Sequence, residues 1–254
     1  MTQPTVDLAT IQHMTRNEAD MAFKKRVRTI FEWVNPRDES LILDLPCGRG
    51  FYLNMLRYTS KARLVGADLD PDVLVKARVN VGHLPDITLM QASIYEIPFP
   101  DNTFDAVILS EVLEHIDDDV AGLKEAFRVV KPGGVVAITV PHANYPFWWD
   151  PINKTLESLF NTHIQHGVFA GIWANHVRLY TREQLRDAVL AAGFRVAEER
   201  SFTHDCFPFI HNLVYGIGMP ILERGLLPKD MATAANRITF EQNDGSLFNP
   251  INLG

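Results

Sequence analysis

The stretch Leu41-Ile-Leu-Asp-Leu-Pro-Cys-Gly-Arg-Gly-Phe-Tyr-Leu53 decides the fold. It opens as an unbroken apolar run, which is typical of a strand buried on both faces of a parallel sheet. It then turns through Pro46, Gly48 and Gly50 and continues into a segment compatible with a helix. Such a turn lets a ligand approach the backbone, and Asp44 stands at the strand end, where open α/β sheets bind ligands. The stretch therefore predicts a binding turn, with a tight turn that binds nothing as the alternative.

The glycine spacing narrows the class of ligand. Gly48-x-Gly50 matches two thirds of the dinucleotide fingerprint G-x-G-x-x-G, but Leu53 occupies the third position. The third glycine allows a helix and a strand to pack closely around a pyrophosphate. Its absence argues against NAD or FAD and favours a nucleoside ligand without a pyrophosphate. A nicotinamide-dependent oxidoreductase is the weaker hypothesis, since the sequence also lacks a Tyr-x-x-x-Lys pair.

Composition and charge argue against several classes of protein. The 254 residues are 46% hydrophobic, enough for one large α/β domain with a cap. The net charge is −7 and the longest basic run is Lys24-Lys-Arg-Val-Arg28, so we expect no nucleic-acid partner. Cys47 and Cys206 form no disulfide framework and no zinc spacing. The polar N-terminus lacks the apolar core of a signal peptide, so we expect a cytoplasmic protein.

The apolar segment 207–227 leaves three interpretations open. It contains His211, Asn212 and Pro220, and it is too short and too interrupted for a transmembrane span. It could form buried core, a substrate wall, or a surface that makes peripheral contact with a membrane or a partner. The sequence predicts no oligomeric state.

Strand and helix patterns alternate along most of the chain, with short connections between them. Such alternation favours a doubly wound α/β fold with a mostly parallel sheet. We expect seven strands, at 41–45, 63–68, 87–93, 104–111, 134–140, 194–202 and 238–241. Helices are expected at 17–34, at 51–58, from Pro71 with Asp70 as its cap, at 119–130, and from a Thr181-x-x-Gln184 capping box to Gly193.

Residues 141–178 break this regular pattern. They are rich in aromatic rings and histidines: His142, Tyr145, Phe147, Trp148, Trp149, Phe160, His163, His166, Phe169, Trp173 and His176. An insertion that leaves the C-terminal end of a strand lies over the ligand site of an α/β sheet. We interpret it as a lid that excludes water, with a small satellite core as the alternative. His163 and His166 would share one face if their segment is helical.

Five short stretches, taken in order, resemble the class I, Rossmann-like S-adenosylmethionine-dependent methyltransferases, in particular the small-molecule branch. They are Leu43-Asp-Leu-Pro-Cys-Gly-Arg-Gly50, Val65-Gly-Ala-Asp-Leu-Asp-Pro71, Ile97-Pro-Phe-Pro-Asp-Asn-Thr-Phe-Asp105, Ser110-Glu-Val-Leu-Glu-His115 and Lys131-Pro-Gly-Gly134. The resemblance covers 38–140 well and 181–200 more loosely. It implies one domain with a helical cap (1–36), a cofactor-binding core (37–140), the lid insertion (141–178) and a C-terminal part with the last strands and the apolar segment (179–254).

The resemblance implies S-adenosyl-L-methionine as the cofactor and assigns a role to each matching position. The residues that would contact the methionine end are Asp44, Leu45, Pro46, Gly48 and Gly50. Asp68 would hold the ribose hydroxyls, as its position twenty residues beyond the glycine turn also indicates, and Leu69 would lie against the adenine.

Three further positions complete the implied cofactor site. Ser93 stands where many members have an acid, which leaves adenine recognition to Ser93 and to the backbone around Ile94. Ser110, at the end of the fourth strand, would lie beside the methionine and the sulfonium. His115 belongs to a sequence motif that is common in the family and would have a structural or cofactor-shell role.

Methyl transfer from a sulfonium requires few catalytic groups from the protein. The methyl group is already activated, so the site mainly aligns nucleophile, methyl and sulfur in a dry environment. A general base is optional, and the candidates are His142 after the fifth strand and His176 at the end of the insertion. We expect no metal site from the histidines.

These inferences lead to one functional expectation and one alternative. We expect a methyltransferase that uses in-line displacement on a small or amphipathic acceptor with an apolar part, such as a lipid, quinone-like or polyketide-like compound. The alternative is a catalytically silent S-adenosylmethionine-binding or scaffolding protein of the same fold.

Overall fold

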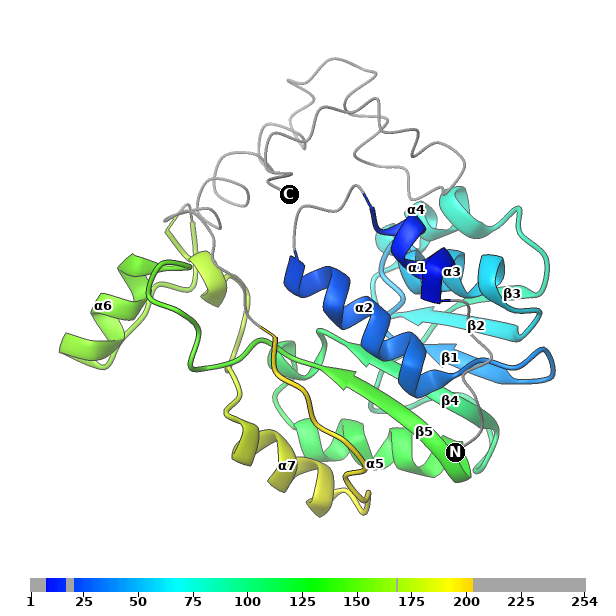
Figure 1. The fold of residues 1–254 in the computed structure, drawn as a ribbon. Coiled ribbons are helices and arrows are strands. Elements are labelled where there is room, and N and C mark those ends of the chain that lie inside the picture. Colours follow the sequence, from blue (N-terminus) through cyan, green and yellow to red (C-terminus); the bar gives the residue numbers. More distant parts are fainter. Residues whose placement is uncertain (1–7, 17–20, 168, 203–254) are drawn as a thin grey trace.

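A five-stranded parallel sheet forms the centre of the molecule (Figure 1). The computed structural model describes residues 8–16, 21–167 and 169–202. The strands are β1 (Leu41–Asp44), β2 (Arg63–Asp68), β3 (Ile87–Gln91), β4 (Phe104–Ser110) and β5 (Val130–Thr139), in the spatial order β3-β2-β1-β4-β5. The order reverses between β1 and β4, and the crevice outside the carboxyl ends of these strands is where such sheets bind ligands. The predicted doubly wound α/β architecture is confirmed.

Helices cover both faces of this sheet (Figure 1). One face packs against α1 (Leu8–Met14), α2 (Met21–Val34), α3 (Phe51–Thr59) and α4 (Pro71–Val81). The other face packs against α5 (Asp119–Val129) and α7 (Arg182–Ala191). Successive strand residues alternate between the two cores, since Ile42 joins the first and Leu43 the second. This two-sided burial explains why the strands read as continuous apolar runs.

The local signals at helix termini are confirmed where the structure describes them. Asp70 Oδ1 accepts a hydrogen bond from the backbone N–H of Asp72 at 2.8 Å, and Pro71 occupies the first turn of α4. Thr181 and Gln184 form the reciprocal capping box of α7. The start of the helix predicted at 17–34 lies at residues outside the described ranges, and the described part is α2.

The sixth strand predicted at 194–202 is not confirmed, because this segment takes part in no strand among the described residues. Its apolar residues pack on the second core, while its charged residues form ion pairs with two helices. Arg200 contacts Glu32 of α2 at 2.6 Å, and Glu199 contacts Arg186 of α7 at 2.9 Å. Side-chain contacts rather than a backbone ladder therefore hold the segment. The strand expected at 238–241 and the apolar segment 207–227 lie outside the described residues.

Two further boundaries differ from the prediction. β5 begins at Val130 rather than at 134, so Lys131-Pro-Gly-Gly134 lies inside the strand. Proline is tolerated there because β5 is an edge strand of the described sheet. The segment that carries His163 and His166 is not helical, since α6 (Pro151–Phe160) ends at Asn161 in the left-handed conformation.

The insertion builds a small core of its own beside the sheet. Besides α6 it contains the short helix η2 (Gly171–Trp173). Tyr145, Ile172 and Leu179 are buried together, and Trp149 and Trp173 pack against them. The satellite core considered above therefore exists. Within the described residues, no helix is both long enough and apolar enough to span a membrane.

Helix α3 and strand β2 approach each other closely at Gly66. In the dinucleotide fingerprint, the third glycine allows this approach. A Cβ atom at Gly66 would overlap Leu53 Cδ1 of α3 and lie 2.8 Å from Leu89 Cδ2 of β3. We expect Gly66→Ala to lower the free energy of unfolding by about 2 kcal/mol, because overpacking forces neighbouring side chains from their rotamers. Urea denaturation measures this cost.

The matched control is the same substitution in a Leu53→Ala background. Removing the Leu53 methyl groups makes room for the new Cβ, so the double variant should be more stable than the sum of the two single changes predicts. Strict additivity would contradict the overlap.

Candidate cofactor and acceptor site

The turn between β1 and α3 is shaped by two glycines in left-handed conformations. Gly48 has φ +52° and Gly50 has φ +86°, values that side chains with a Cβ rarely adopt. A Cβ at Gly50 would lie 3.0 Å from Val81 Cγ1, whereas a Cβ at Gly48 would meet no atom within 4 Å. The turn is fixed by the Cys47 N–H, which donates to the Ala67 carbonyl at 2.8 Å. Gly48 thus borders open space on the side from which a ligand would approach.

Asp44 carries a buried carboxylate at this turn. The residue is 0% exposed, and neither carboxylate oxygen has a hydrogen-bond partner among the described residues. Burial raises the pKa of Asp44 well above its usual value, and the neighbouring Asp68 raises it further. A buried carboxylate without partners is costly, and a cationic donor would remove that cost. The ammonium group of the S-adenosylmethionine methionine end has this chemistry, so the residues fit the cofactor.

Asp68 lies at the end of β2, next to the turn. Its two carboxylate oxygens accept hydrogen bonds from the backbone N–H groups of Gly48 and Asp70, each at 3.0 Å. A carboxylate has about four acceptor positions, so capacity for two hydroxyl donors remains. Leu69 follows with 65% of its surface exposed. The structure therefore brings the predicted methionine-end and ribose residues together around one turn.

Four other predicted cofactor residues lie in or beside the core. The side chains of Leu45 and Ile94 are buried in the second core. Pro46 follows Leu45 through a cis peptide bond. Ser93 Oγ accepts a hydrogen bond from the Tyr95 N–H at 3.2 Å. Backbone groups, rather than the Leu45 and Ile94 side chains, are what these positions can offer a ligand.

Ser110 belongs to a hydrogen-bonded chain. Its Oγ lies 3.3 Å from the Tyr52 hydroxyl and 2.9 Å from Thr139 Oγ1. Thr139 in turn donates to Glu111 Oε1 at 2.9 Å, and Arg26 of α2 pairs with the same oxygen at 2.8 Å. Burial raises the pKa of Tyr52 to about 12, so its hydroxyl stays protonated at neutral pH. Sequence reasoning missed these partners of Ser110, which come from α2, α3 and β5.

A cavity of about 660 Å³ lies at the carboxyl ends of the strands, between α2, the end of β5 and the insertion. Its polar lining includes Arg26, Glu111 and the two predicted base candidates, His142 and His176. His142 Nδ1 accepts a hydrogen bond from the Asn144 N–H at 2.9 Å. Burial and the neighbouring His115 lower the pKa of His176, which favours its neutral form. The fold thus brings both predicted histidines to one cavity.

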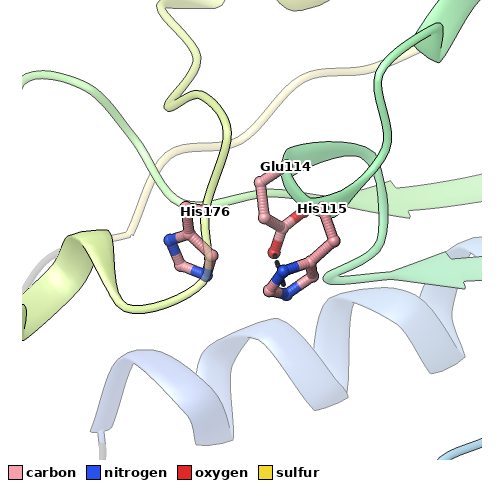
Figure 2. A group of neighbouring side chains, drawn as sticks. All are labelled: Glu114, His115 and His176. Atoms are coloured by element: carbon pink, nitrogen blue, oxygen red, sulfur yellow. Dashed lines mark ion pairs between the residues drawn. The ribbon is translucent and has the colours of Figure 1, made fainter. Parts of the chain in front are cut away.

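Glu114 is a second buried acid, and sequence reasoning did not select it. It is 0% exposed and both of its carboxylate oxygens lack a hydrogen-bond partner among the described residues. Burial, with Glu111 nearby, raises its pKa to about 8. Figure 2 shows Glu114, His115 and His176 side by side, with the two imidazole centroids 4.7 Å apart. The predicted cofactor-shell residue His115 therefore meets a predicted base.

Known proteins resemble this chain most over its core. Residues 43–138 match the family described as a methyltransferase domain. An uncharacterized methyltransferase of Schizosaccharomyces pombe is 36% identical over 104 residues, and the chain spans only 37% of that protein's length, with 37% of this chain covered. A demethylmenaquinone methyltransferase of Listeria monocytogenes is 26% identical over 196 residues, which cover 74% of this chain and 78% of that protein.

A solved structure shows the same fold. An S-adenosylmethionine-dependent methyltransferase of Thermotoga maritima matches with a TM-score of 0.52 and 19% identity, over 73% of this chain and 81% of that one. The fold, the glycine turn with its buried carboxylate and the family match agree. The methyltransferase-domain match over residues 43–138 and the methyltransferase relatives support a class I S-adenosylmethionine-dependent methyltransferase, with S-adenosylmethionine as the cofactor.

Proposed function

We propose that this protein transfers the methyl group of S-adenosylmethionine, by in-line displacement, to a small or amphipathic acceptor held in the 660 Å³ cavity. One observation carries the proposal. The cavity opens at the carboxyl ends of the strands, and Glu111 in its wall is joined through Thr139 to Ser110. A hydrogen-bonded chain thus runs from the acceptor cavity to the residue proposed to lie beside the sulfonium.

The residues around the turn would hold the cofactor, which supplies an activated methyl group when bound. In this proposal Asp44 accepts from the ammonium group, and Asp68 accepts from the ribose hydroxyls. Leu69 covers the adenine, and Ser93 with the backbone around Ile94 recognises its edge. The open space at Gly48 and the buried carboxylate of Asp44 support this arrangement.

The cavity lining supports an acceptor that is part apolar and part polar. Apolar walls come from α2, from the end of β5 and from the insertion: Phe23, Ile30, Trp33, Ile138, Val140, Pro146 and Trp149. His142 and His176 are the proposed bases when the acceptor needs one, and the low pKa of His176 suits a proton acceptor. The Listeria relative is named a demethylmenaquinone methyltransferase, which is in keeping with a quinone-like acceptor.

In this proposal the 141–178 insertion acts as a lid that keeps water from the reacting atoms. Its contribution of Tyr145, Trp149 and Ile172 to the cavity supports that role. With this role for the insertion, we divide the chain into a cap (1–36), a core (37–140), a lid (141–178) and a C-terminal part (179–254). A cytoplasmic location, and a membrane contact through 207–227, stay predictions of the sequence.

The direct test is methyl transfer to a chosen set of acceptors. We expect mass spectrometry to find methylation of an isoprenoid-tailed hydroquinone in preference to the untailed ring. Trp149→Ala should raise the KM for the tailed acceptor at least tenfold, because it removes an apolar wall. Phe160→Ala is the matched control, since this exposed ring does not line the cavity. Tight cofactor binding without methylation of any acceptor would favour the silent binding protein.

A further inference from the structure

Three side chains of metal-ligating type converge beside the cavity, and one of them, His176, belongs to its lining. Glu114 and His115 come from the short helix η1 (Leu113–His115), and His176 comes from the loop that follows η2 (Figure 2). One potential ligand atom from each residue lies within 4.8 Å of the other two. We refer to these residues as the Glu114–His115–His176 cluster.

The carboxylate of this cluster lacks the contacts that a buried acid requires. Glu114 is fully buried and neither of its oxygens has a hydrogen-bond partner among the described residues. His115 lies beside it, with Nε2 3.9 Å from Glu114 Oε1. A buried carboxylate is retained when it is paired or when it binds a metal ion. The geometry therefore leaves room for a cation between these side chains.

Both imidazoles present a nitrogen suited to a metal ion. His115 Nδ1 lies 2.9 Å from the Asn175 carbonyl oxygen, so it carries the proton and leaves the Nε2 lone pair free on the Glu114 side. Metal-bound histidines are commonly oriented by such a carbonyl contact. The Nδ1 of His176 is buried and has no hydrogen-bond partner among the described residues. One nitrogen of each imidazole and one carboxylate oxygen thus lie within 4.8 Å of one another.

We propose that the Glu114–His115–His176 cluster binds one divalent transition-metal ion, of which Zn²⁺ is the representative. Two imidazoles and one carboxylate suit Zn²⁺ or Fe²⁺, whereas Mg²⁺ and Ca²⁺ prefer oxygen ligands alone. In tetrahedral coordination, ligand atoms about 2.1 Å from one ion lie about 3.4 Å apart, so atoms that are now as much as 4.8 Å apart need to close by about 1.4 Å. The Val177 N–H donates to the Glu114 carbonyl at 2.8 Å and holds the two segments together.

An ion at this place would have a coordination position directed to the acceptor. His176 and Asn175 line the cavity together with Glu111, so an acceptor oxygen could reach the ion from there. A metal ion lowers the pKa of a bound hydroxyl and orients it. This role rests on the proposed function and takes the place of His176 as a base, whereas the site itself rests only on the cluster.

The test is Zn²⁺ binding to the full-length chain after removal of metal, measured by competition with a chromophoric chelator. The chain has nine histidines and two cysteines, so differences between variants identify the site. Glu114→Gln and His176→Ala should each lower the affinity of one site at least 100-fold. His83→Ala, which changes an exposed histidine outside the cluster, should leave it unchanged. Co²⁺ in place of Zn²⁺ should give visible absorption bands that His176→Ala alters.

Each result has a defined meaning. Equal Zn²⁺ affinity in the parent and both cluster variants, or no saturable binding at 100 µM as a trial concentration (about −5.5 kcal/mol), overturns the site. If Glu114→Gln does not fold, the partly exposed His176 still provides the comparison. Zn²⁺ binding that depends on His176, in a protein that does not bind S-adenosylhomocysteine, supports the site and refutes the proposed function. S-adenosylhomocysteine binding with no cluster-dependent Zn²⁺ refutes the site alone.

Discussion

Asp44→Asn is expected to weaken S-adenosylmethionine binding at least 100-fold and, at the same time, to stabilise the unliganded protein. The loss of affinity corresponds to about 2.7 kcal/mol and follows because the amide cannot balance the charge of the ammonium group. The gain in stability follows because the variant no longer buries a carboxylate without a hydrogen-bond partner. Isothermal titration measures the first effect and urea denaturation the second.

The pH dependence of stability provides a second measurement on the same residue. Burial raises the pKa of Asp44 in the folded protein, so the folded state holds a proton that the unfolded chain releases. The contribution of Asp44 to stability is therefore present below the unfolded pKa of about 3.9 and falls as the pH rises toward the folded pKa. Asp44→Asn should lack this decline.

Asp187→Asn is the control for Asp44, because it removes an exposed carboxylate of α7. It should change neither the cofactor affinity nor the stability by a measurable amount. An Asp44→Asn protein that binds S-adenosylmethionine within threefold of the parent would contradict the role of Asp44. Reduced stability of that variant would contradict the view that the carboxylate is unsatisfied in the unliganded state.

The fold could be predicted wherever the strands are buried on both faces. The runs at 41–44, 63–68 and 104–110 consist mostly of apolar residues because helices cover both sides of the sheet, and caps such as Asp70 mark the helix starts locally. The segment 194–202 has a similar apolar pattern because Phe194 and Val196 also pack on a core, although it joins no ladder among the described residues. An apolar pattern indicates that residues are buried, whereas a strand also needs a neighbouring strand with which it forms backbone hydrogen bonds.

The cofactor turn could be predicted for a similar reason, since its glycines and acids lie close together in the sequence. Glu114 could not be, because its burial depends on residues about 60 positions away. The Val177 N–H, in the loop that carries His176, donates to the Glu114 carbonyl, and no local sequence pattern predicts that contact. No metal site could be predicted from the sequence, because a supporting acid and a rigid arrangement around the histidines are not visible in it.

Asp150→Ala is expected to lower the free energy of unfolding by about 3 kcal/mol, because it leaves several buried donors without an acceptor. The Asp150 carboxylate is fully buried at the start of α6. It accepts from the Asn153 N–H at 3.1 Å, from Asn153 Nδ2 at 2.7 Å and from the Ile172 N–H at 3.1 Å. It therefore joins α6 to η2, and thermal or urea denaturation measures the loss. The Asp150→Asn variant keeps one carbonyl oxygen as an acceptor and should cost less.

We expect Asp150→Ala to change the acceptor cavity but not the cofactor turn. Gly171 and Ile172 line the acceptor cavity, and a Cβ at Gly171 would overlap the Asp150 carboxylate, so this contact sets the shape of that wall. The Asp150 carboxylate makes its hydrogen bonds to Asn153 and Ile172, and the cofactor turn between β1 and α3 is not among its partners. The variant should therefore raise the KM for the acceptor and expose the insertion to protease, while the affinity for S-adenosylmethionine stays within about twofold (0.4 kcal/mol). A parallel loss of cofactor affinity would show that the insertion and the cofactor turn fold as one unit, and the lid would then not be a separable part of the site.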